Sequence, residues 1–365
     1  MKKRKNIAGI ALTAALAALF ILMLAKPEVV RESAAAALHD TALLVVPVLF
    51  PFAVLSSLLV GTKNFSKVAG RLMRPLCQLL RFSESAGSAI LIGFLCGFPL
   101  GSAAVCRLYK NGQLDTSEAE RLLALCHNTG PSFIIGYIGT VVFENVYFSV
   151  FLYLAEILIA VLIACRMAKN APLPMAHPYT AEHDVIFPFS AAIRDSAAAM
   201  LTVTASVVWF RVIADVAASV LSPLALPIPR AVLLSLLECT SGIGAGATMG
   251  GTLGYALAGF SLGFSGLSVL TQAAAFAYEA RLSMRKCYIA KVWQGFLLAL
   301  TAALFSLRGA IPAAVRLTPV TVDFRLLTAI EVILLSLALI IPSIIDSIIR
   351  RRRRTAAKRK DCVPL

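Results

Sequence analysis

Long apolar runs recur along this sequence, and each of them needs surroundings other than water. A helix that crosses the hydrocarbon part of a bilayer needs about 20 mainly apolar residues. Six runs approach or exceed that length, at 7–25, 42–61, 148–167, 189–221, 292–307 and 326–349. Only 15% of the residues are charged, against about 25% in soluble domains. The sequence therefore predicts an all-α fold, a polytopic bundle of transmembrane helices.

The first of these runs has to be distinguished from a signal peptide, because basic residues precede it. Residues 7–25 are longer than the apolar core of such a peptide, which has about 7–15 residues. No convincing small-x-small cleavage site follows the run. We therefore expect a retained N-terminal transmembrane helix within residues 1–30.

The net charge of +15 is gathered into a few clusters. Basic residues precede the first apolar run, fill the connections 63–81 and 281–291, and form the tail 350–365. Because basic loops stay on the cytoplasmic side, we expect both termini, and a linker at 169–189, in the cytoplasm. Connection 63–81 alternates apolar and basic residues, which predicts an amphipathic helix in the membrane interface. No groove-reading motif accompanies the charge, so nucleic acid is not an expected partner.

Two regions, 87–144 and 230–277, are apolar but repeatedly interrupted by Gly, Pro and polar residues. Lipid offers no partner to backbone that leaves the helix, so such backbone lies in protein or beside a water-filled cavity. We therefore expect broken or re-entrant helices here, and a site where they end. In the first region a helix that starts near Asp115 ends at an interruption. This interruption is either a helix N-terminus that would suit an anion or a loop at the membrane surface. The helix-break residues of this region are Gly97, Pro99, Gly101, Gly130 and Pro131, and its candidate binding residues are Ser102, Asn128 and Thr129.

The second interrupted region contains an acidic residue, Glu238, after a mostly apolar stretch. A carboxylate at membrane depth is costly unless it is paired or protonated. It could bind a cation, accept a proton, hold a donor on a substrate, or simply end a helix. The helix-break residues here are Gly242, Gly263 and Gly266, and the candidate binding residues are Glu238, Thr240, Ser241, Ser265, Ser268 and Gln272.

Two pairs of segments resemble one another at nearly the same offset. Residues 31–42 and 194–205 are identical at eight of twelve positions, and GFLCGF at 93–98 matches GFSLGF at 259–264. These matches predict repeats at 31–168 and 190–349. The charge clusters place the first segment outside and its match inside, so the repeats are expected to be inverted, as in many secondary transporters. Asn128 follows the first Gly-Phe segment whereas Glu238 precedes the second, so strict two-fold symmetry is not expected.

Catalytic and metal-binding patterns are not found. The eight cysteines are scattered singly, and no nucleotide-binding loop, zinc motif or nucleophile elbow occurs. We therefore expect neither an enzyme nor a metal or other cofactor. Among the remaining charges, Arg211 and Asp215 are spaced to pair on one helix face. Glu156 is expected either to contact a neighbouring helix or to serve proton coupling.

Several segments together resemble a known family. These are LFPFAVLSSLL at 49–59, GFLCGFPLGS at 93–102, SEAERLLALCHNTGPSFIIGYIG at 117–139, LLECTSG at 236–242 and GFSGLSVLTQ at 263–272. The chain resembles the YlbJ-type sporulation integral membrane proteins, which carry a nucleoside-recognition or gate domain and are related to concentrative nucleoside transporters. The two repeats would then be gate-like.

The resemblance implies a role in spore formation. It implies transport of a small organic anion, dipicolinic acid, into the developing forespore, across the outer forespore membrane that derives from the mother cell. The partners expected are that anion and the lipid bilayer, while a coupling ion (proton or sodium) and a homo-oligomer are left open. The alternatives are a transporter of nucleoside-like or other small solutes, and a non-transporting assembly protein needed for the spore cortex.

Overall fold

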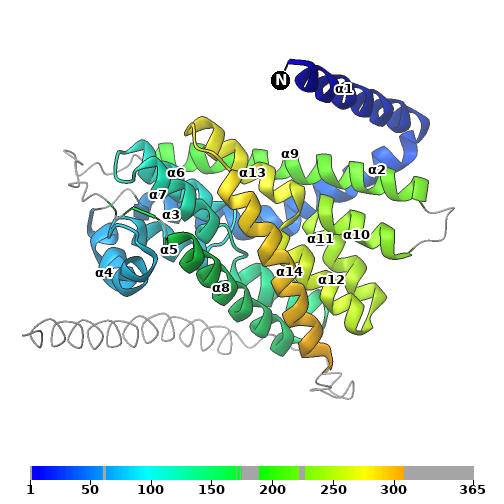
Figure 1. Cartoon of the computed structure of the whole chain (residues 1–365). Helices are drawn as coiled ribbons and strands as arrows, with labels where there is room; N and C mark the ends of the chain where they lie inside the picture. Colours follow the sequence, from blue (N-terminus) through cyan, green and yellow to red (C-terminus); the bar gives the residue numbers. More distant parts are fainter. Residues whose placement is uncertain are drawn as a thin grey trace, which may run out of the picture.

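The computed structural model describes residues 2–60, 63–169, 171–172, 174, 189–221 and 227–307. Within these residues every regular element is a helix and no strand occurs, which confirms the all-α prediction. Figure 1 shows a bundle in which α14 (Arg285–Leu307) and α8 (Val146–Ala168) lie side by side, with α1 (Lys2–Ala25) standing apart. The predicted span at 326–349 and the tail 350–365 lie outside the described residues.

Four helical stretches in the described residues are long and apolar enough to cross a membrane. They are α8, α9 (Phe189–Leu221), α14, and the pair α12 (Gly251–Phe264) and α13 (Gly266–Glu279) taken together. A fifth span results if α1 and α2 (Pro27–Asp40), bent by 95°, count as one. The runs predicted at 148–167, 189–221 and 292–307 are thus confirmed as apolar helices. The run at 42–61 is helical but split into η1 (Thr41–Val45), a short π-helix, and α3 (Val46–Val60).

The outward faces of α14 and α8 are apolar. On α14, Trp293 and Phe296 are 61% and 60% exposed, and Leu300 and Leu304 continue the same stripe at helical spacing. On α8, Leu158 and its neighbours four residues away are likewise exposed. A contiguous apolar surface of this kind is unfavourable in water and suits lipid. The bundle is therefore built for a bilayer.

Two successions of helices resemble each other in order. The first is α5 (Ala86–Leu95), α6 (Leu100–Lys110), α7 (Thr116–Cys126), η2 (Ser132–Val142) and α8. The second is α10 (Pro227–Leu237), α11 (Cys239–Met249), α12, α13 and α14. Each consists of two short helices around a turn, a helix interrupted partway, and a long apolar helix. α14 packs along α12 and also against α7 and α8, so it joins the two successions.

The Gly-Phe segments at 93–98 and 259–264 fall at different points of these successions. Gly93 lies on α5, in the pair of short helices, whereas Gly259 lies on α12, in the interrupted helix. By order of elements, the turn before α6 corresponds to the turn at Glu238, and the break before η2 corresponds to the break at Ser265. The polar interruptions therefore do follow the same order in both successions.

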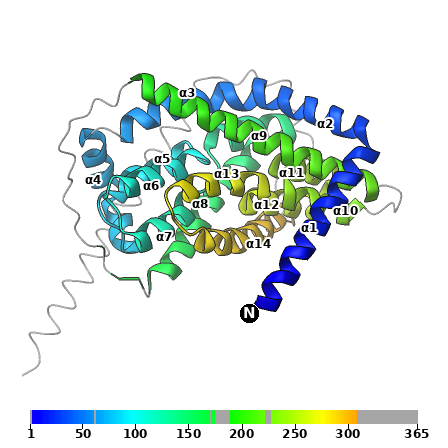
Figure 2. The ribbon, with the colours of Figure 1, turned by 90° about the horizontal axis from the view of Figure 1, so that it is seen from above.

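Three helices flank one side of the bundle. Figure 2 shows α2, α3 and α9 side by side there. The Ser33 hydroxyl on α2 donates a 2.7 Å hydrogen bond to the carboxylate of Asp215 on α9. The segments 31–42 and 194–205 thus start on neighbouring helices.

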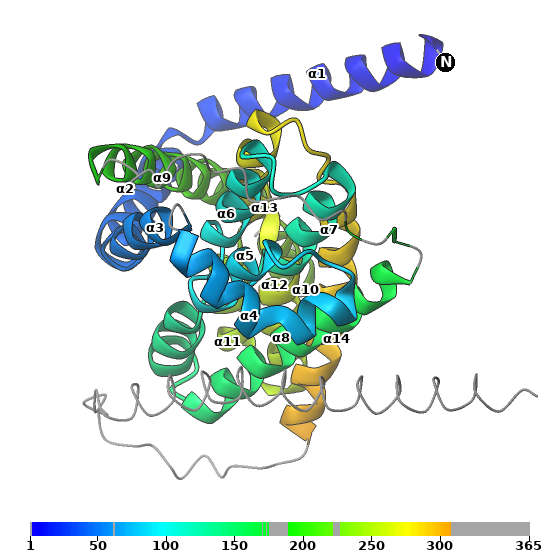
Figure 3. The same cartoon turned by 90° about the vertical axis from the view of Figure 1, so that its left-hand side faces the viewer.

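The predicted amphipathic helix is present as α4 (Lys63–Leu80), on the outside of the bundle in Figure 3. Its buried face consists of Ala69, Met73, Leu76 and Leu80, spaced at three or four residues, whereas Val68 is 62% exposed. α4 packs on α5 at Gly70 and Gly87, where a side chain on either glycine would overlap the other helix or the turn that precedes it.

Candidate functional site

A cavity of about 360 Å³ lies between the two successions and the flanking helices. The turn before α6, the break before η2 and η2 itself supply one wall, and the Glu238 turn with α13 supplies the opposite wall. Residues of α2, η1, α3 and α9 close the side. Ligand-binding cavities measure roughly 300–1,000 Å³, so this one suits a small solute.

In the first succession the turn and the break pack directly against each other. The Phe98 N–H donates a 2.6 Å hydrogen bond to the Asn128 carbonyl. Gly97 has a φ of 71°, and a Cβ there would overlap the backbone of Gly130. A Cβ on Gly130 would in turn lie 2.8 Å from the Cys96 carbonyl oxygen. Glycine at 97 and 130 therefore allows the two irregular segments to touch at the edge of the cavity.

The second succession makes a similar contact. Glu238 is the N-cap of α11, and its carboxylate accepts hydrogen bonds from the Thr240 N–H at 3.1 Å and the Ser241 N–H at 2.7 Å, as well as from the Thr240 hydroxyl. Gly266 has a φ of 67°, and a Cβ there would lie 2.8 Å from the nitrogen of Cys239. The Glu238 turn and the break at Ser265–Gly266 are thus packed together as well.

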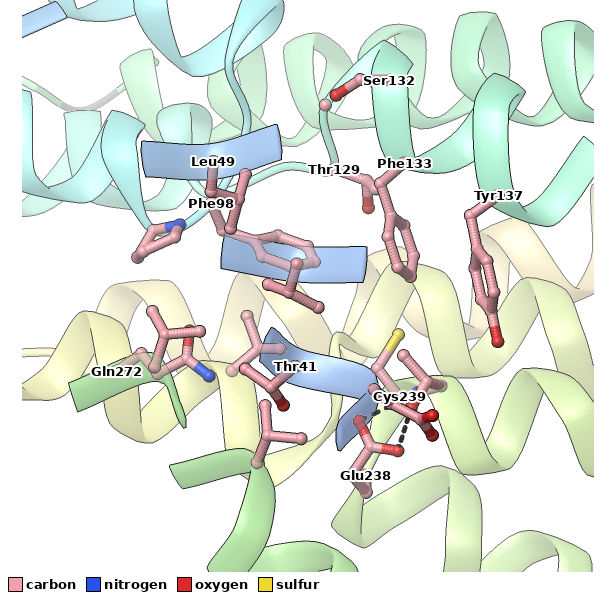
Figure 4. Close-up of a pocket in the computed structure, with 18 of the residues that line it drawn as sticks. Thr41, Leu49, Phe98, Thr129, Ser132, Phe133, Tyr137, Glu238, Cys239 and Gln272 are labelled. Carbon is pink, nitrogen blue, oxygen red and sulfur yellow. Dashed lines mark hydrogen bonds between the residues drawn. The ribbon is translucent and has the colours of Figure 1, made fainter. Parts of the chain in front are cut away.

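Aromatic side chains form much of the first wall. Figure 4 shows Phe98, Phe133 and Tyr137 on one side of the cavity, with Glu238 and Gln272 across from them. The Phe133 and Tyr137 rings are 5.3 Å apart. A flat apolar group could stack against such rings while a polar group faced the opposite wall.

One basic side chain, Arg211 of α9, is among the lining residues. It forms an ion pair with Asp215 at 3.4 Å, as predicted, and approaches the carboxylate of Asp40 at 3.9 Å. Because Arg211 and Asp215 are four residues apart, the ion pair within α9 already accounted for the charge of Arg211. Sequence reasoning therefore missed that it also borders the cavity beside α2.

A buried polar cluster lies behind the break of the first succession. Glu156 of α8 accepts hydrogen bonds from the Thr129 N–H at 3.1 Å and the Thr129 hydroxyl at 3.2 Å. Lys291 of α14 donates to Oδ1 of Asn128 at 3.4 Å, and the Gln294 amide donates to the same atom at 3.0 Å. All five side chains are fully buried. We call these five residues the buried cluster.

Lys291 and Gln294 were not predicted to be functional. Lys291 was taken as part of a basic connection at 281–291, but it lies inside α14 with no exposed surface, so it is not part of an exposed connection. Counting basic residues along the chain cannot show which of them packing will enclose. The available signal was a lysine and a glutamine three residues apart in an apolar helix, which places both on one face.

The nine predicted binding residues lie in three settings. Thr129, Glu238, Thr240 and Gln272 line the cavity. Ser102 and Asn128 lie buried behind it, where the Ser102 hydroxyl is 3.1 Å from Nδ1 of His127. The Ser241 N–H donates to the Glu238 carboxylate that caps α11, while Ser265 and Ser268 are fully buried. Of the predicted break residues, Pro99 and Gly130 also line the cavity, and Pro131 stands at the start of η2.

The remaining predicted break residues make close helix contacts. Gly101 packs against the carbonyl of Cys126, Gly242 against Ser235, and Gly263 against the carbonyl of Gln294. Several N–H groups at the two interruptions already have an acceptor within the chain. The Glu156 carboxylate already accepts from Thr129, and the Glu238 carboxylate already accepts from Thr240 and Ser241, so the chain satisfies these donors itself.

Five buried polar atoms around the site have no hydrogen-bond partner in the described residues: Oε2 of Glu156, Oε1 of Gln294, Nε2 of His127, Oγ of Ser241 and Oγ of Ser268. Buried polar atoms are usually paired, so each of these marks a place where a proton, water or ligand could act. Within the described residues, no three His, Cys, Asp or Glu side chains gather as metal ligands would.

Comparison with known proteins adds one similarity. Over 102 residues the chain is 32% identical to the sporulation integral membrane protein YlbJ of Bacillus subtilis (strain 168). The aligned stretch is 28% of this chain and 25% of that relative. No protein-family model matches the chain, and no solved structure matches it. The similarity supports the YlbJ-type family, and together with the apolar helices it identifies a multi-pass membrane protein.

Proposed function

We propose that this protein carries a small organic anion through its central cavity, with dipicolinic acid as the substrate and the developing forespore as the destination. The observation that carries the proposal is the meeting of two helix interruptions at one cavity inside an apolar bundle. Irregular backbone at membrane depth is characteristic of transport sites, where broken helices surround the substrate. The similarity to a sporulation membrane protein supports the cellular setting.

The lining of the cavity suits an aromatic acid. The rings of Phe98, Phe133 and Tyr137 offer a surface on which a pyridine ring can stack. Arg211 offers a guanidinium group, which pairs with carboxylates in a bidentate manner. Arg211 is shared with Asp40 and Asp215, so a substrate carboxylate would have to compete with these two side chains.

A nucleoside-like solute is the second candidate. It is favoured by the position of Glu238 and Gln272, whose oxygen and nitrogen atoms face the same cavity as the aromatic rings. A ribose hydroxyl needs an acceptor, and Glu238 is one. However, the Glu238 carboxylate already accepts three hydrogen bonds within its own turn, which leaves it less free for a substrate.

Transport by the purified full-length protein in liposomes tests the proposal. Labelled dipicolinate should accumulate, and unlabelled dipicolinate should compete better than an aliphatic dicarboxylate or a nucleoside. Phe133→Leu should weaken uptake because it removes a ring from the cavity wall, whereas Phe296→Leu, on the exposed face of α14, should not. Competition by the nucleoside alone would favour the second candidate, and uptake of neither solute would exclude both.

An experiment in cells tests the destination. Cells that lack the gene should make dipicolinate and retain it in the mother cell. Wild type should restore the forespore content, while Asn128→Ala combined with Glu238→Ala should not, although it is made and inserted. A forespore that fills normally without the gene would instead favour a membrane assembly protein.

A further inference from the structure

We propose that Glu156 is the binding site of a coupling proton, and that its protonation raises the affinity of the cavity for an anion. This inference rests on the proposed function, since it names the ion that drives the same transport site. It starts from the buried cluster and its single link to the cavity, Thr129.

Glu156 has the position that such a residue needs. It has no exposed surface, and one carboxylate oxygen accepts both hydrogen bonds from Thr129. The other oxygen, Oε2, is buried and has no partner. An ionised carboxylate with an unpaired oxygen is costly away from water, and a proton on that oxygen removes the charge. Thr129 also lines the cavity, so one residue separates the carboxyl group from the substrate.

Lys291 links the protonation of Glu156 to the charge next to the cavity. Its ammonium group is fully buried and donates to Asn128, the residue next to Thr129 in the break. With Glu156 ionised, the two charges of the buried cluster cancel. When Glu156 binds a proton, the carboxylate becomes a neutral acid and the charge of Lys291 is no longer balanced. The cluster then carries one positive charge directly behind the cavity wall.

The cavity itself needs such a change before an anion can bind well. Its lining contains two acidic side chains, Asp40 and Glu238, against one basic side chain, Arg211. An anion that enters this lining meets net repulsion, because the acidic side chains outnumber the basic one. One added positive charge offsets that repulsion. Proton and anion would therefore bind together and move in the same direction.

The surroundings of Glu156 favour a proton over a metal cation. The groups that act on it electrostatically are Lys291 of α14, Tyr153 of its own helix and Cys239 of α11, and His127 beside the break faces Lys291. η2 has no charged residue, and no charged side chain of α4 is among these groups. A sodium ion at Glu156 would find one carboxylate and a neighbouring ammonium group. The ammonium group offsets the attraction of the carboxylate for a sodium ion, whereas a proton bonds to the carboxylate oxygen and neutralises it.

Infrared spectroscopy of the full-length protein in lipid tests proton binding without any substrate. The wild type should show a protonated-carboxyl signal that grows as the pH falls. Part of this signal should be a high-frequency carbonyl band, which is typical of a protonated carboxyl group shielded from water, and Glu156→Gln should lack that band. Glu120→Gln is the matched control, because Glu120 on α7 pairs with Lys286 on α14 at 3.0 Å outside the buried cluster, and it should keep the signal. A high-frequency band that survives in Glu156→Gln, or a wild type in which no such band changes with pH, would overturn the proposal.

Transport measurements test the coupling. An inward pH gradient, acid outside, should drive dipicolinate accumulation in the wild type and in Glu120→Gln. Glu156→Gln resembles the protonated form, so it should bind dipicolinate with an affinity that no longer changes with pH, and lose at least about tenfold of the gradient-driven accumulation. Wild-type uptake that is independent of pH would overturn the proton site and leave the transport proposal standing. A titrating Glu156 signal without any dipicolinate uptake would support proton binding at Glu156 and overturn the transport proposal.

Discussion

The Nζ atom of Lys291 donates a hydrogen bond to Oδ1 of Asn128, although 163 residues separate the two along the chain. Lys291 belongs to α14, the last helix of the second succession, and Asn128 to the break of the first. Gln294 binds the same oxygen and also lies 3.4 Å from the carbonyl of Glu156. One helix of the second succession therefore holds the irregular segment of the first in place.

Removing Lys291 should destabilise the protein through the charge it leaves behind. Lys291 and Glu156 form no direct ion pair but act on each other electrostatically inside the buried cluster, so the cost should lie below the about 3–5 kcal/mol of a broken buried ion pair. We expect Lys291→Met to lower the Tm in detergent markedly, and Lys291→Met combined with Glu156→Gln to recover part of the loss, because no charge is then left unbalanced. A double variant whose loss equals the sum of the two single losses would show that the charges are not coupled.

Gly97→Ala should be much more harmful than Gly112→Ala. Both glycines have a φ near 70°, so alanine at either position carries backbone strain of about 1–2 kcal/mol. At Gly112 a Cβ would meet open space, whereas at Gly97 it would overlap the backbone of Gly130. We expect Gly112→Ala to remain folded on size-exclusion chromatography and Gly97→Ala to lose most of its folded yield. Equal yields would mean that the two irregular segments need not touch.

Gly136→Phe should block transport without unfolding the protein. Gly136 lines the cavity, and a Cβ there would meet nothing within 4 Å. A phenyl ring would occupy the space that we assign to the substrate, so uptake should fall at least about tenfold, equivalent to ~1.4 kcal/mol of apparent binding. Gly244→Phe is the control, because Gly244 also has open space but does not line the cavity. If both variants transport normally, the substrate passes elsewhere.

Arg211→Gln should weaken anion binding selectively. Hydrogen bonds to a charged group are worth about 1.5–3 kcal/mol, so the KM for dipicolinate should rise roughly 10- to 100-fold, while Arg211→Lys should be milder. Arg194→Gln on the same helix is the comparison, since the Arg194 side chain is 80% exposed and pairs only with its neighbour Asp195 among the interactions described. An unchanged KM in Arg211→Gln would remove Arg211 from the binding site.

Features that depend on nearby residues could be predicted from the sequence. Asp115 was expected near a helix start, and its carboxylate does accept a 2.7 Å hydrogen bond from the Glu118 N–H as the cap of α7. The long apolar helices could be predicted because the apolar composition of each run is itself the evidence for a membrane environment. The irregular turns were located because Gly and Pro mark them directly.

Features that depend on packing could not be predicted. Lys291 and Gln294 bond to Asn128, which is far away in the chain, and the sequence around residues 291–294 does not indicate this partner. Arg211 formed its predicted ion pair, but only the folded chain brings α2 close enough to reveal the cavity beside it. Glu238 was ambiguous because one side chain both caps α11 and lines the cavity.

The Glu238 carboxylate accepts the first N–H groups of α11, and the Glu156 carboxylate accepts the Thr129 N–H in the first break, so at both interruptions an acid of the chain already holds N–H donors. These N–H groups are consequently not available to an incoming carboxylate. The selectivity for a solute should then depend more on its aromatic ring and its shape than on its number of carboxyl groups. A monocarboxylic pyridine should rival dipicolinate more closely than any open-chain diacid does.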